Sequence, residues 1–412
     1  MPAETITVRA LETDAELATF YHLAASTFAR SRPPEVVGPD WRRSNERDPR
    51  AAGTSVRGTF RGGTLLGGCI VYERLLRLPP AELRTACIGA VVTGEEYRKQ
   101  GVARAVLDDV ISFATKGGCS LLLLDGIAHF YNQWGFVDVV DMPVHSVERA
   151  HILELPPSPC SRRPATPDDA AAMAELYRRH FDAYDGSFER TVALQEHRLR
   201  HQSTESPAMM IVGPGGETQG YFLGDASHPQ YGLEIIAETW PAALAALHYH
   251  TRLLDSLDEP PSVVKWLVPM RSPLFYLLAD RLWIVSETCN HRNAGWMART
   301  ANLPNLFEAL LPRWSEQWRH ARLPWGGRLT LDVDGASVTL DLSDDGARQV
   351  GGEHDGPRVR MSQEVFTQLL WGFRPVSWAR TQPDQHLPPE LMPVLEALFA
   401  PSDAWIPWSD SF

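Results

Sequence analysis

The sequence predicts an α/β protein with mixed (α+β) sheets, built from two consecutive α/β units and a third α/β domain. Continuous apolar runs alternate with amphipathic helical segments over the first 150 or so residues, which is typical of this class. The same order of elements recurs after residues 156–167, where five prolines in twelve residues indicate a linker. After about residue 300 the composition shifts to a hairpin and a capped helix. We therefore expect domains at residues 1–157, 158–300 and 301–412.

Composition and charge narrow the classes of protein. The chain has 412 residues, of which 44% are hydrophobic and 22% charged, and its formal net charge is −12 at pH 7. This charge suits a cationic substrate or simply solubility, and it argues against nucleic acid and anionic membranes, which need a basic face. No run approaches the roughly 18 apolar residues of a membrane span. We expect neither a nucleic-acid nor a membrane partner.

Cysteines, histidines and the amino-terminal residues bear on location and metals. The five cysteines are scattered without C-x-x-C pairs, and no basic segment precedes an apolar one at the amino terminus. Both features are typical of a reduced, cytoplasmic protein. His248 and His250 fall on different faces of a predicted helix, and H-E-x-x-H is not present in the sequence. We expect no metal and a cytoplasmic location.

The first part of the chain predicts a strand, a helix and a hairpin. Residues 5–10 alternate in hydrophobicity, and Thr13 with Glu16 forms a capping-box pattern that begins a helix. Residues 31–50 are polar and contain prolines, which favours a loop or a short helical stretch on the substrate side. Two runs joined by Arg61-Gly62-Gly63 then predict a hairpin, Thr54–Phe60 and Thr64–Tyr72.

The centre of the first unit is a strand–turn–helix–strand. Cys87–Val92 is a continuous apolar run, as expected for a strand buried on both faces. Gly101–Ala114 has helical periodicity, and Ser120–Leu124 predicts a second buried strand. The segments expected to complete the unit are an aromatic helix and closing strands, at Ile127–Trp134, Val137–Val140 and 143–148.

The second unit repeats this order in a degenerate form. We expect strands at Met209–Val212, Gln219–Leu223, Leu233–Ala237 and Val263–Val268, and helices at Ala242–Leu257 and Pro273–Leu282. The turn at 238–241, which corresponds to the turn before Gly101, contains no glycine and no basic residue. In the third domain, Asp334-Gly335 predicts a two-residue hairpin turn, and Ser362 caps a helix through Leu370.

The turn from Arg98 to Ala103 is a candidate phosphate site. A helix begins at Gly101, so the N–H groups of its first turn and the helix dipole favour an anion such as a pyrophosphate. Arg98 and Arg104 add positive charge. The alternative is an ordinary exposed strand–helix turn. The position after a buried strand and ahead of an aromatic segment favours the functional interpretation.

The aromatic segment that ends at Gly135-Phe136 contains a candidate general acid, Tyr131. A phenol with a pKa near 10 can donate a hydrogen bond or a proton to a departing thiolate. The alternative is that all three aromatic side chains pack the core, and we prefer that interpretation for Phe130 and Trp134. For Tyr131 the choice depends on a family resemblance, which favours the catalytic role.

These residues resemble motif A of the GNAT superfamily of N-acetyltransferases over residues 1–155. The resemblance implies acetyl-CoA as cosubstrate, pantetheine pairing with the backbone of Val91 and Thr93, and a general acid at Tyr131. The residues that it implies for cofactor binding are Val91, Val92, Thr93, Arg98, Lys99, Gln100, Gly101, Val102, Ala103 and Arg104. Residues 160–300 are similar only in element order, which implies a second GNAT fold without a phosphate loop.

Together, two GNAT-like units, a third domain and a terminal phenylalanine resemble the Eis (enhanced intracellular survival) acetyltransferases. The resemblance implies a C-terminal domain like sterol carrier protein, a hexamer, and a terminal carboxylate, on Phe412, that returns to the first active site. The substrate-side Trp-Arg pair of that family matches Trp41 and Arg42. Two acidic positions of its drug-binding members fall on Arg30 and Ser411, which weakens the case for polycationic aminoglycosides.

We therefore expect an acyltransferase that moves an acetyl group from acetyl-CoA directly to a primary amine of a small molecule or a lysine side chain. The alternative is a catalytically lapsed GNAT-fold protein that binds CoA or lipid, because the second unit has already lost its loop. A fold-level likeness to lipid carriers is a weak argument for lipid binding.

Overall fold

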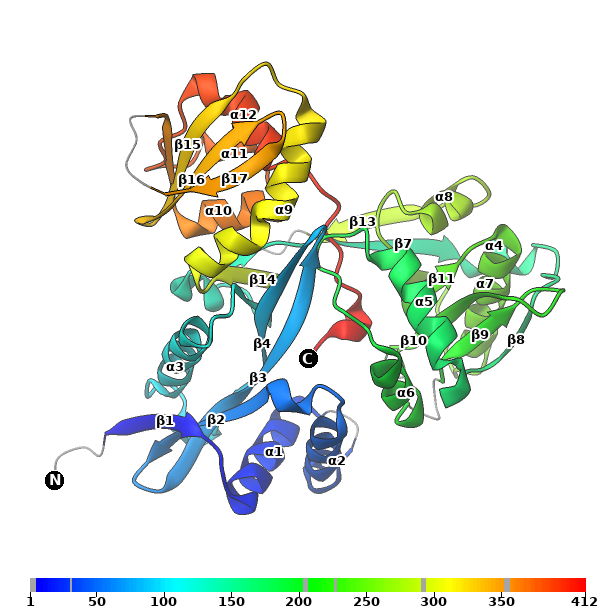
Figure 1. Ribbon diagram of the computed structural model, residues 1–412. Coiled ribbons are helices and arrows are strands. Elements are labelled where there is room, and N and C mark those ends of the chain that lie inside the picture. Colours follow the sequence, from blue (N-terminus) through cyan, green and yellow to red (C-terminus); the bar gives the residue numbers. More distant parts are fainter. Residues whose placement is uncertain (1–4, 30–31, 203–206, 226–227, 290–293, 352–355) are drawn as a thin grey trace. The chain divides into compact units, whose positions relative to one another are not determined.

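The computed structural model describes residues 5–29, 32–202, 207–225, 228–289, 294–351 and 356–412 (Figure 1). The chain divides into two compact units, and neither is continuous in sequence. The first unit comprises Met1–Val140, His291–Ser402 and Phe412, and the second comprises Asp141–Asn290 and Asp403–Ser411. Among the described residues, no helix has the length and apolar character that crossing a membrane requires.

The first unit is built on a seven-stranded mixed sheet with the order β1-β2-β3-β4-β5-β14-β6. Its strands are β1 (Ile6–Ala10), β2 (Thr54–Arg61), β3 (Thr64–Leu78), β4 (Ala81–Thr93), β5 (Leu121–Gly126), β14 (Gly295–Thr300) and β6 (Val137–Asp138). Neighbours from β1 to β4 are antiparallel, β4 and β5 are parallel, and β14 runs antiparallel to both β5 and β6. The strands predicted up to Leu124 are confirmed.

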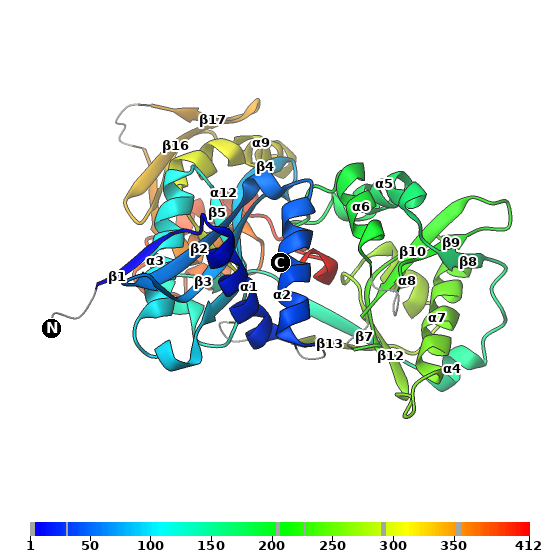
Figure 2. The ribbon, with the colours of Figure 1, turned by 90° about the horizontal axis from the view of Figure 1, so that it is seen from below.

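Helices α1 (Asp14–Phe28) and α3 (Val102–Lys116) pack on this sheet, and α2 (Pro34–Arg47) packs on α1. The predicted capping box of Thr13 and Glu16 begins α1. Helix α2 lies beside α1 in both ribbon views (Figures 1 and 2), and Gly38 permits this, because a Cβ there would lie 2.9 Å from the carbonyl oxygen of Tyr21. Most of this segment thus forms a full helix that begins at Pro34 and contains Pro39, where a loop or a short helical stretch was predicted.

Helix α3 buries one face against the sheet. Val106, Leu107 and Val110 are inaccessible to solvent and pack with Leu122 and Phe136 in one core cluster. The helix predicted at Ile127–Trp134 is shorter, since only the 3₁₀ helix η3 (Tyr131–Trp134) forms there. His129, with φ of 60°, has a left-handed backbone conformation that a helix cannot contain.

The later part of the first unit contains α9 (Leu303–Ala321) and a four-stranded sheet of order β17-β16-β15-β18. Its strands and remaining helices are β15 (Gly327–Val333), β16 (Ala336–Ser343), β17 (Gly346–Val350), β18 (Arg358–Met361), α10 (Gln363–Leu370), α11 (Val376–Ala379), η5 (Pro389–Leu391) and α12 (Met392–Leu398). The predicted hairpin turn is confirmed, with φ of 48° at Asp334 and 85° at Gly335. The sterol-carrier likeness stays a prediction.

The second unit has its own seven-stranded sheet, of order β13-β7-β12-β11-β10-β9-β8. The strands are β13 (Val285–Cys289), β7 (Met142–Glu148), β12 (Val263–Leu267), β11 (Tyr231–Ala237), β10 (Thr218–Gly224), β9 (Met209–Val212) and β8 (Ser161–Pro164). Its helices are α4 (Arg149–Leu153), α5 (Ala170–Phe181), α6 (Val192–Arg200), α7 (Trp240–Asp255), α8 (Pro273–Ala279) and η6 (Trp408–Asp410). Parallel β11 and β12 with α7 between them repeat the arrangement of β4, α3 and β5.

Two strands pair in a different sheet from the one that their position in the sequence suggests. Residues 143–148 were expected to close the first unit, but β7 pairs with β12 and β13 of the second sheet. In return β14, which was not predicted, pairs with β5 of the first sheet. Hydrophobic pattern predicts that a segment is a strand and leaves its partner open, which is why this prediction was wrong. The division at residues 157 and 300 stays a prediction.

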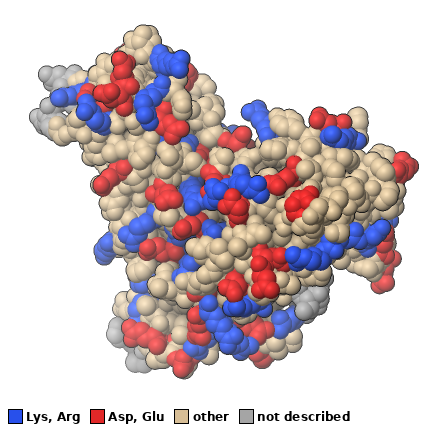
Figure 3. Space-filling model, turned by 45° about the vertical axis from the view of Figure 1, so that its right-hand side comes forward, with Lys and Arg blue, Asp and Glu red and all other residues tan. Residues whose placement is uncertain are grey.

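Charged side chains are interspersed on the face shown in Figure 3, where lysine and arginine alternate with aspartate and glutamate. Many of them form exposed ion pairs, such as Glu175 with Arg178 in α5. Nucleic-acid binding requires a continuous basic surface. On this face the described residues form none.

Candidate active site

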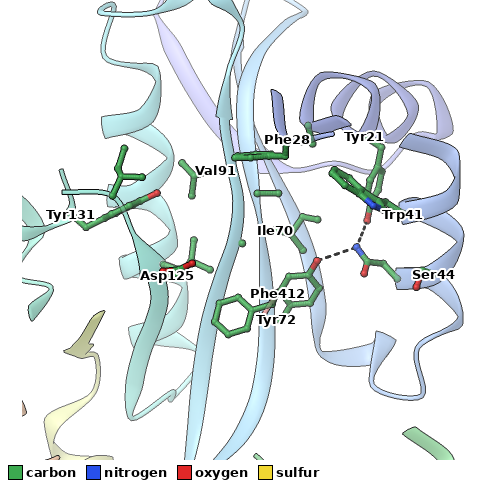
Figure 4. A pocket seen from close by; sticks show the side chains of 16 residues that line it. Tyr21, Phe28, Trp41, Ser44, Ile70, Tyr72, Val91, Asp125, Tyr131 and Phe412 are labelled. Atoms are coloured by element: carbon green, nitrogen blue, oxygen red, sulfur yellow. Dashed lines mark hydrogen bonds between the residues drawn. The ribbon is translucent and has the colours of Figure 1, made fainter. Parts of the chain in front are cut away.

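A cavity of about 530 Å³ lies in the first unit, beside the place where β4 and β5 separate (Figure 4). Its walls come from α1, α2, β3, β4, the end of β5, η3 and the last residue of the chain. The lining residues are Tyr21, Ala24, Phe28, Trp41, Ser44, Asn45, Ile70, Tyr72, Ile88, Gly89, Ala90, Val91, Asp125, Ile127, Tyr131 and Phe412. Predicted site residues from three distant parts of the sequence therefore meet here.

Strand β4 separates from β5 halfway along its length. Parallel pairing runs from Thr85 opposite Leu121 to Ile88 opposite Leu124, although β4 continues to Thr93. Ala90 has a φ of 49°, and the register with β3 shifts at this point, which marks a β-bulge. Beyond Ile88 the backbone of β4 therefore offers an edge to an extended ligand. The side chain of Val91 faces the cavity, whereas that of Val92 is buried.

The predicted phosphate turn follows β4 after a short 3₁₀ helix, η2 (Glu95–Tyr97). Gly101 is the N-cap of α3 with φ of 83°, and no side chain caps the helix. The N–H groups of Val102, Ala103 and Arg104 thus lie in a helical first turn that has no intrahelical acceptors for them. Arg98 and Lys99 are exposed, so both cations are accessible to an anion at this turn. This local geometry fits a pyrophosphate.

Two side chains of this region are held by neighbours. The guanidinium of Arg104 donates to Oε1 of Gln133 at 2.8 Å and lies 5.5 Å from the ring centroid of Trp134. The side-chain oxygen of Gln100 accepts from Arg61 at 3.0 Å. These contacts order the surface next to the turn without occupying the helix N-terminus.

Tyr131 is fixed by aromatic packing, with its hydroxyl directed toward Val91 in Figure 4. Its ring lies edge-on to Phe130 at 4.9 Å between centroids and contacts Phe136 at 6.2 Å. Only 7% of its surface is exposed, and burial raises the pKa of its phenol to about 12. Tyr131 therefore keeps its proton at neutral pH. Nearby Trp134 donates to Oδ1 of Asp108 at 2.7 Å, consistent with its predicted structural role.

The carboxyl end of Phe412 lies against β4. A Cβ built on Gly89 would be 2.8 Å from the carboxyl carbon of Phe412 and 2.9 Å from its oxygen, so only glycine permits this approach. The ring of Phe412 packs on Tyr72, at 6.1 Å between centroids, and on Trp296, at 5.6 Å. The terminal carboxylate thus reaches the stretch of β4 that has left β5.

One hydrogen-bonded group on the α2 side of the cavity was not predicted. The Asn45 amide donates to the hydroxyls of Tyr21, at 3.0 Å, and Tyr72, at 3.1 Å (Figure 4). Burial raises the pKa of both phenols. These residues come from α2, α1 and β3. The group could be predicted only if residues 34–47 were first predicted to form a helix beside α1.

The four predicted substrate residues have different surroundings. Trp41 lines the cavity. Arg42 forms ion pairs with Asp14 and Glu46, at 2.5 and 2.6 Å, and is not among the lining residues. Ser411 is exposed and also outside the lining set. Arg30 falls outside the described residues.

Residues 7–137 match the family model described as an acetyltransferase (GNAT) domain. This stretch contains β4, the turn at Gly101 and Tyr131. This stretch of the chain is therefore similar to a GNAT acetyltransferase domain, and it contains every residue listed above as lining the cavity except Phe412. A search of the curated proteins finds no match.

Solved structures share the fold over nearly the whole chain. A GCN5-related N-acetyltransferase from Kribbella flavida superimposes with a TM-score of 0.75 at 16% identity, covering 100% of this chain and 99% of that one. A probable N-acyltransferase from Enterococcus faecalis V583 has a TM-score of 0.73 at 14% identity, covering 98% of each. Eis1 from Mycobacterium abscessus has a TM-score of 0.65 at 16% identity, covering 99% and 100%. At these identities the likeness shows the fold alone.

Proposed function

We propose that this protein is an acetyl-CoA-dependent N-acetyltransferase that acetylates a primary amine of a small molecule or a lysine side chain by direct transfer. The observation that carries the proposal is the opening between β4 and β5 past Ile88, which leads to a left-handed Gly101 at a helix N-terminus. A separated strand and an anion-binding turn, one after the other, suit an extended ligand that ends in a pyrophosphate. Both belong to the matched GNAT domain.

In this proposal the backbone of Val91 and Thr93 pairs with the pantetheine arm, next to buried Val92. The turn from Arg98 through Lys99, Gln100, Gly101, Val102 and Ala103 to Arg104 holds the pyrophosphate. The first-turn N–H groups supply the directional contacts, and the exposed cations add charge. No metal is required by this arrangement of donors.

The ammonium first gives one proton to water. During transfer the neutral amine nitrogen bonds to the acetyl carbon, the carbon–sulfur bond breaks, and the nitrogen loses its second proton to water. Tyr131 donates its phenolic proton to the departing sulfur and is reprotonated from water. The raised pKa of Tyr131, about 12, ensures that the proton is present before each turnover. Holding both reactants in one cavity supplies a large part of the acceleration.

The Phe412 carboxylate holds the incoming ammonium. An α-carboxyl pKa near 3.5 and an amine pKa near 10.4 differ by about 7 units, or roughly 9 kcal/mol, which is too much for direct proton removal by the carboxylate at its ordinary pKa. We assign the carboxylate the role of positioning the ammonium, while water carries the proton away.

The test is thiol release from acetyl-CoA with a panel of primary amines, with the acetylated product identified by mass spectrometry and acetyl-CoA binding measured by calorimetry. We expect binding and amine-dependent release. Binding without release on any amine would favour the catalytically lapsed alternative. Absence of binding would contradict the proposal altogether.

The resemblance to Eis proteins supports three further proposals about the whole chain. These are the domain division at residues 157 and 300, a sterol-carrier-like domain in residues 301–412, and a cytoplasmic hexamer. Light scattering of the purified protein tests the hexamer, since a monomer of 46.0 kDa gives a sixfold smaller mass. Lipid extraction tests whether the last domain carries a lipid.

A further inference from the structure

The amine side of the cavity is lined mainly by aromatic rings. Tyr21 and Phe28 come from α1, Trp41 from α2, Tyr72 from β3, and Phe412 adds the terminal ring (Figure 4). Phe28 and Trp41 are 48% and 36% exposed, so both side chains are accessible to a ligand. A ligand that covers them gains apolar contact and aromatic stacking.

The charges of the lining residues are acidic and few. Asp125 and the Phe412 carboxylate are the two acids, and the described lining contains no lysine, arginine or histidine. The nearby cation Arg42 is engaged by Asp14 and Glu46. The cavity therefore favours a cation of low charge over a neutral or anionic acceptor. A polycation would bring more ammonium groups than the lining has carboxylates, and each extra one would lose hydration without a partner.

Hydrogen-bonding groups are also scarce on this side. Both N–H groups of the Asn45 amide are donated to Tyr21 and Tyr72. Apart from the tyrosines, Asn45 and Ser44 are the uncharged polar side chains among the described lining residues. An amino sugar that placed its hydroxyls here would leave several of them unsatisfied, which costs affinity for each group. An aromatic ring makes no such demand.

We propose that the acceptor is a monoamine that carries an aromatic ring on a short alkyl chain, an arylalkylamine. Its ring packs among Phe28, Trp41 and Tyr72, and its ammonium is held by the carboxylate side of the cavity. This inference rests on the proposed function and specifies its substrate class. Trp41 is then a specificity-determining residue.

The test compares kcat/KM for four amines: 2-phenylethylamine, hexylamine, spermidine and an aminoglycoside. Hexylamine keeps one ammonium and removes the ring, whereas the last two add charge or hydroxyl groups. We expect 2-phenylethylamine to exceed hexylamine by about tenfold, the size expected for two aromatic contacts, and to exceed spermidine and the aminoglycoside by more.

Variants assign the preference to the cavity. Trp41→Ala should raise KM for 2-phenylethylamine several-fold and raise KM for hexylamine less, because hexylamine loses apolar contact but no ring–ring contact, and it should change kcat little for either amine. Phe28→Leu, which keeps an apolar side chain, should do the same more weakly, so the test survives if the first variant folds poorly. Trp283→Ala, which removes a tryptophan that is 76% exposed in the second unit, is the control and should change neither amine.

The outcomes separate the two proposals. Faster acetylation of spermidine or of the aminoglycoside would overturn the arylalkylamine inference and leave the acetyltransferase intact. Equal kcat/KM for the ring-bearing and ringless amines would also overturn it. Acetyl-CoA binding without thiol release on any of the four amines would overturn both.

Discussion

The two seven-stranded sheets contain the same local arrangement and use it differently. In each, a strand runs parallel to a neighbour, leaves it after a few residue pairs and leads into a helix. Strands β4 and β5 pair up to Ile88 and Leu124, whereas β11 and β12 pair at Tyr231 with Lys265 and at Gly232 with Trp266. Separation of the strands is therefore common to both sheets, and it does not by itself make a binding site.

The first difference lies at the start of the following helix. Helix α3 begins at Gly101, without a side-chain cap. Helix α7 begins at Thr239, whose side chain accepts from the N–H of Ala242 at 3.3 Å, and Pro241 has no N–H to offer. Of the three N–H positions in the first turn of α7, that of Ala242 is therefore capped and that of Pro241 is missing, whereas no side chain caps the first turn of α3.

The second difference is what lies against the separated strand. Beside β4 there is a cavity, but beside β11 there is a buried ion-pair network. Glu234 of β11 binds Arg190 at 2.6 Å, and Arg190 binds Asp410 of η6 at 2.8 Å, with all three side chains at most 2% exposed. Tyr221 and Tyr177 donate their hydroxyls to Glu234 and Asp410. Side chains of the chain itself therefore cover β11 at Glu234, where the first unit has a cavity beside β4. We infer that a ligand site needs both available donors and available space.

The largest effect on acetyl transfer is expected for Tyr131→Phe. Removal of the phenolic proton should lower kcat by about 10²-fold or more, the usual contribution of a general acid. The Kd for acetyl-CoA should change little, because the ring remains. Since the pKa of Tyr131 is about 12, its titration should cause no fall in wild-type kcat between pH 7 and 10. Unchanged turnover in the variant would remove Tyr131 from the mechanism.

The terminal carboxylate comes next. A short tag appended after Phe412 moves the carboxylate away from Gly89, and we expect kcat to fall by about 10- to 100-fold, the range for a lost hydrogen bond to a charged group. Acetyl-CoA affinity should remain within twofold. The same tag at the amino terminus is the control. Intact kinetics with the carboxy-terminal tag would refute the role of Phe412.

A smaller effect tests the phosphate turn with a matched pair of glycines. Gly101 and Gly335 have φ of 83° and 85°, and a Cβ at either position meets no atom within 4 Å. Alanine costs about 1–2 kcal/mol of backbone strain at both. Gly101→Ala should also weaken acetyl-CoA binding by about tenfold, as its methyl group crowds the pyrophosphate. Equal Kd values for the two variants would place the pyrophosphate elsewhere.

The smallest effect on the cofactor is expected in the second unit, where the change should act on stability alone. Glu234→Gln removes one charge of the buried network and should lower the free energy of unfolding by about 3 kcal/mol, without altering the Kd for acetyl-CoA. Glu175→Gln, in the exposed pair with Arg178, should leave the free energy of unfolding nearly unchanged. Denaturant unfolding and calorimetry measure both. Weakened acetyl-CoA binding in Glu234→Gln would contradict the assignment of cofactor binding to the first unit alone.

The same network makes the free energy of unfolding depend on pH. Burial raises the pKa of Asp410, but Arg190 and Arg198 outweigh burial and hold the pKa below its usual range. The stabilisation is therefore complete above the unfolded pKa, near about 4, and is lost as the pH falls further. In Glu234→Gln, Asp410 keeps its partners, so this loss below pH 4 should persist.

The local sequence pattern was sufficient to predict the part of the site formed by β4, the following turn and Tyr131. The apolar run of β4, the glycine at the helix start and the position of Tyr131 are all read within one continuous segment, and the family match covers it. Three features depend on distant contacts and could not be predicted. The first is the continuation of α2 through Pro39, which brings Asn45 to Tyr21 and Tyr72. The second is the exchange of β7 and β14 between the two sheets. The third is the burial of Asp410, in η6, against Arg190.

The most direct test of the contrast between the two openings is a crystal structure of the protein with CoA. We predict one CoA per chain, with pantetheine paired to the backbone of Val91 and Thr93, the pyrophosphate at the N-terminus of α3, and the sulfur beside the hydroxyl of Tyr131. The Glu234–Arg190–Asp410 network beside β11 should remain intact, and no CoA should lie between β11 and β12. CoA bound beside β11, or bound anywhere other than between β4 and β5, would contradict the proposal that the opening in the first sheet is the cofactor site.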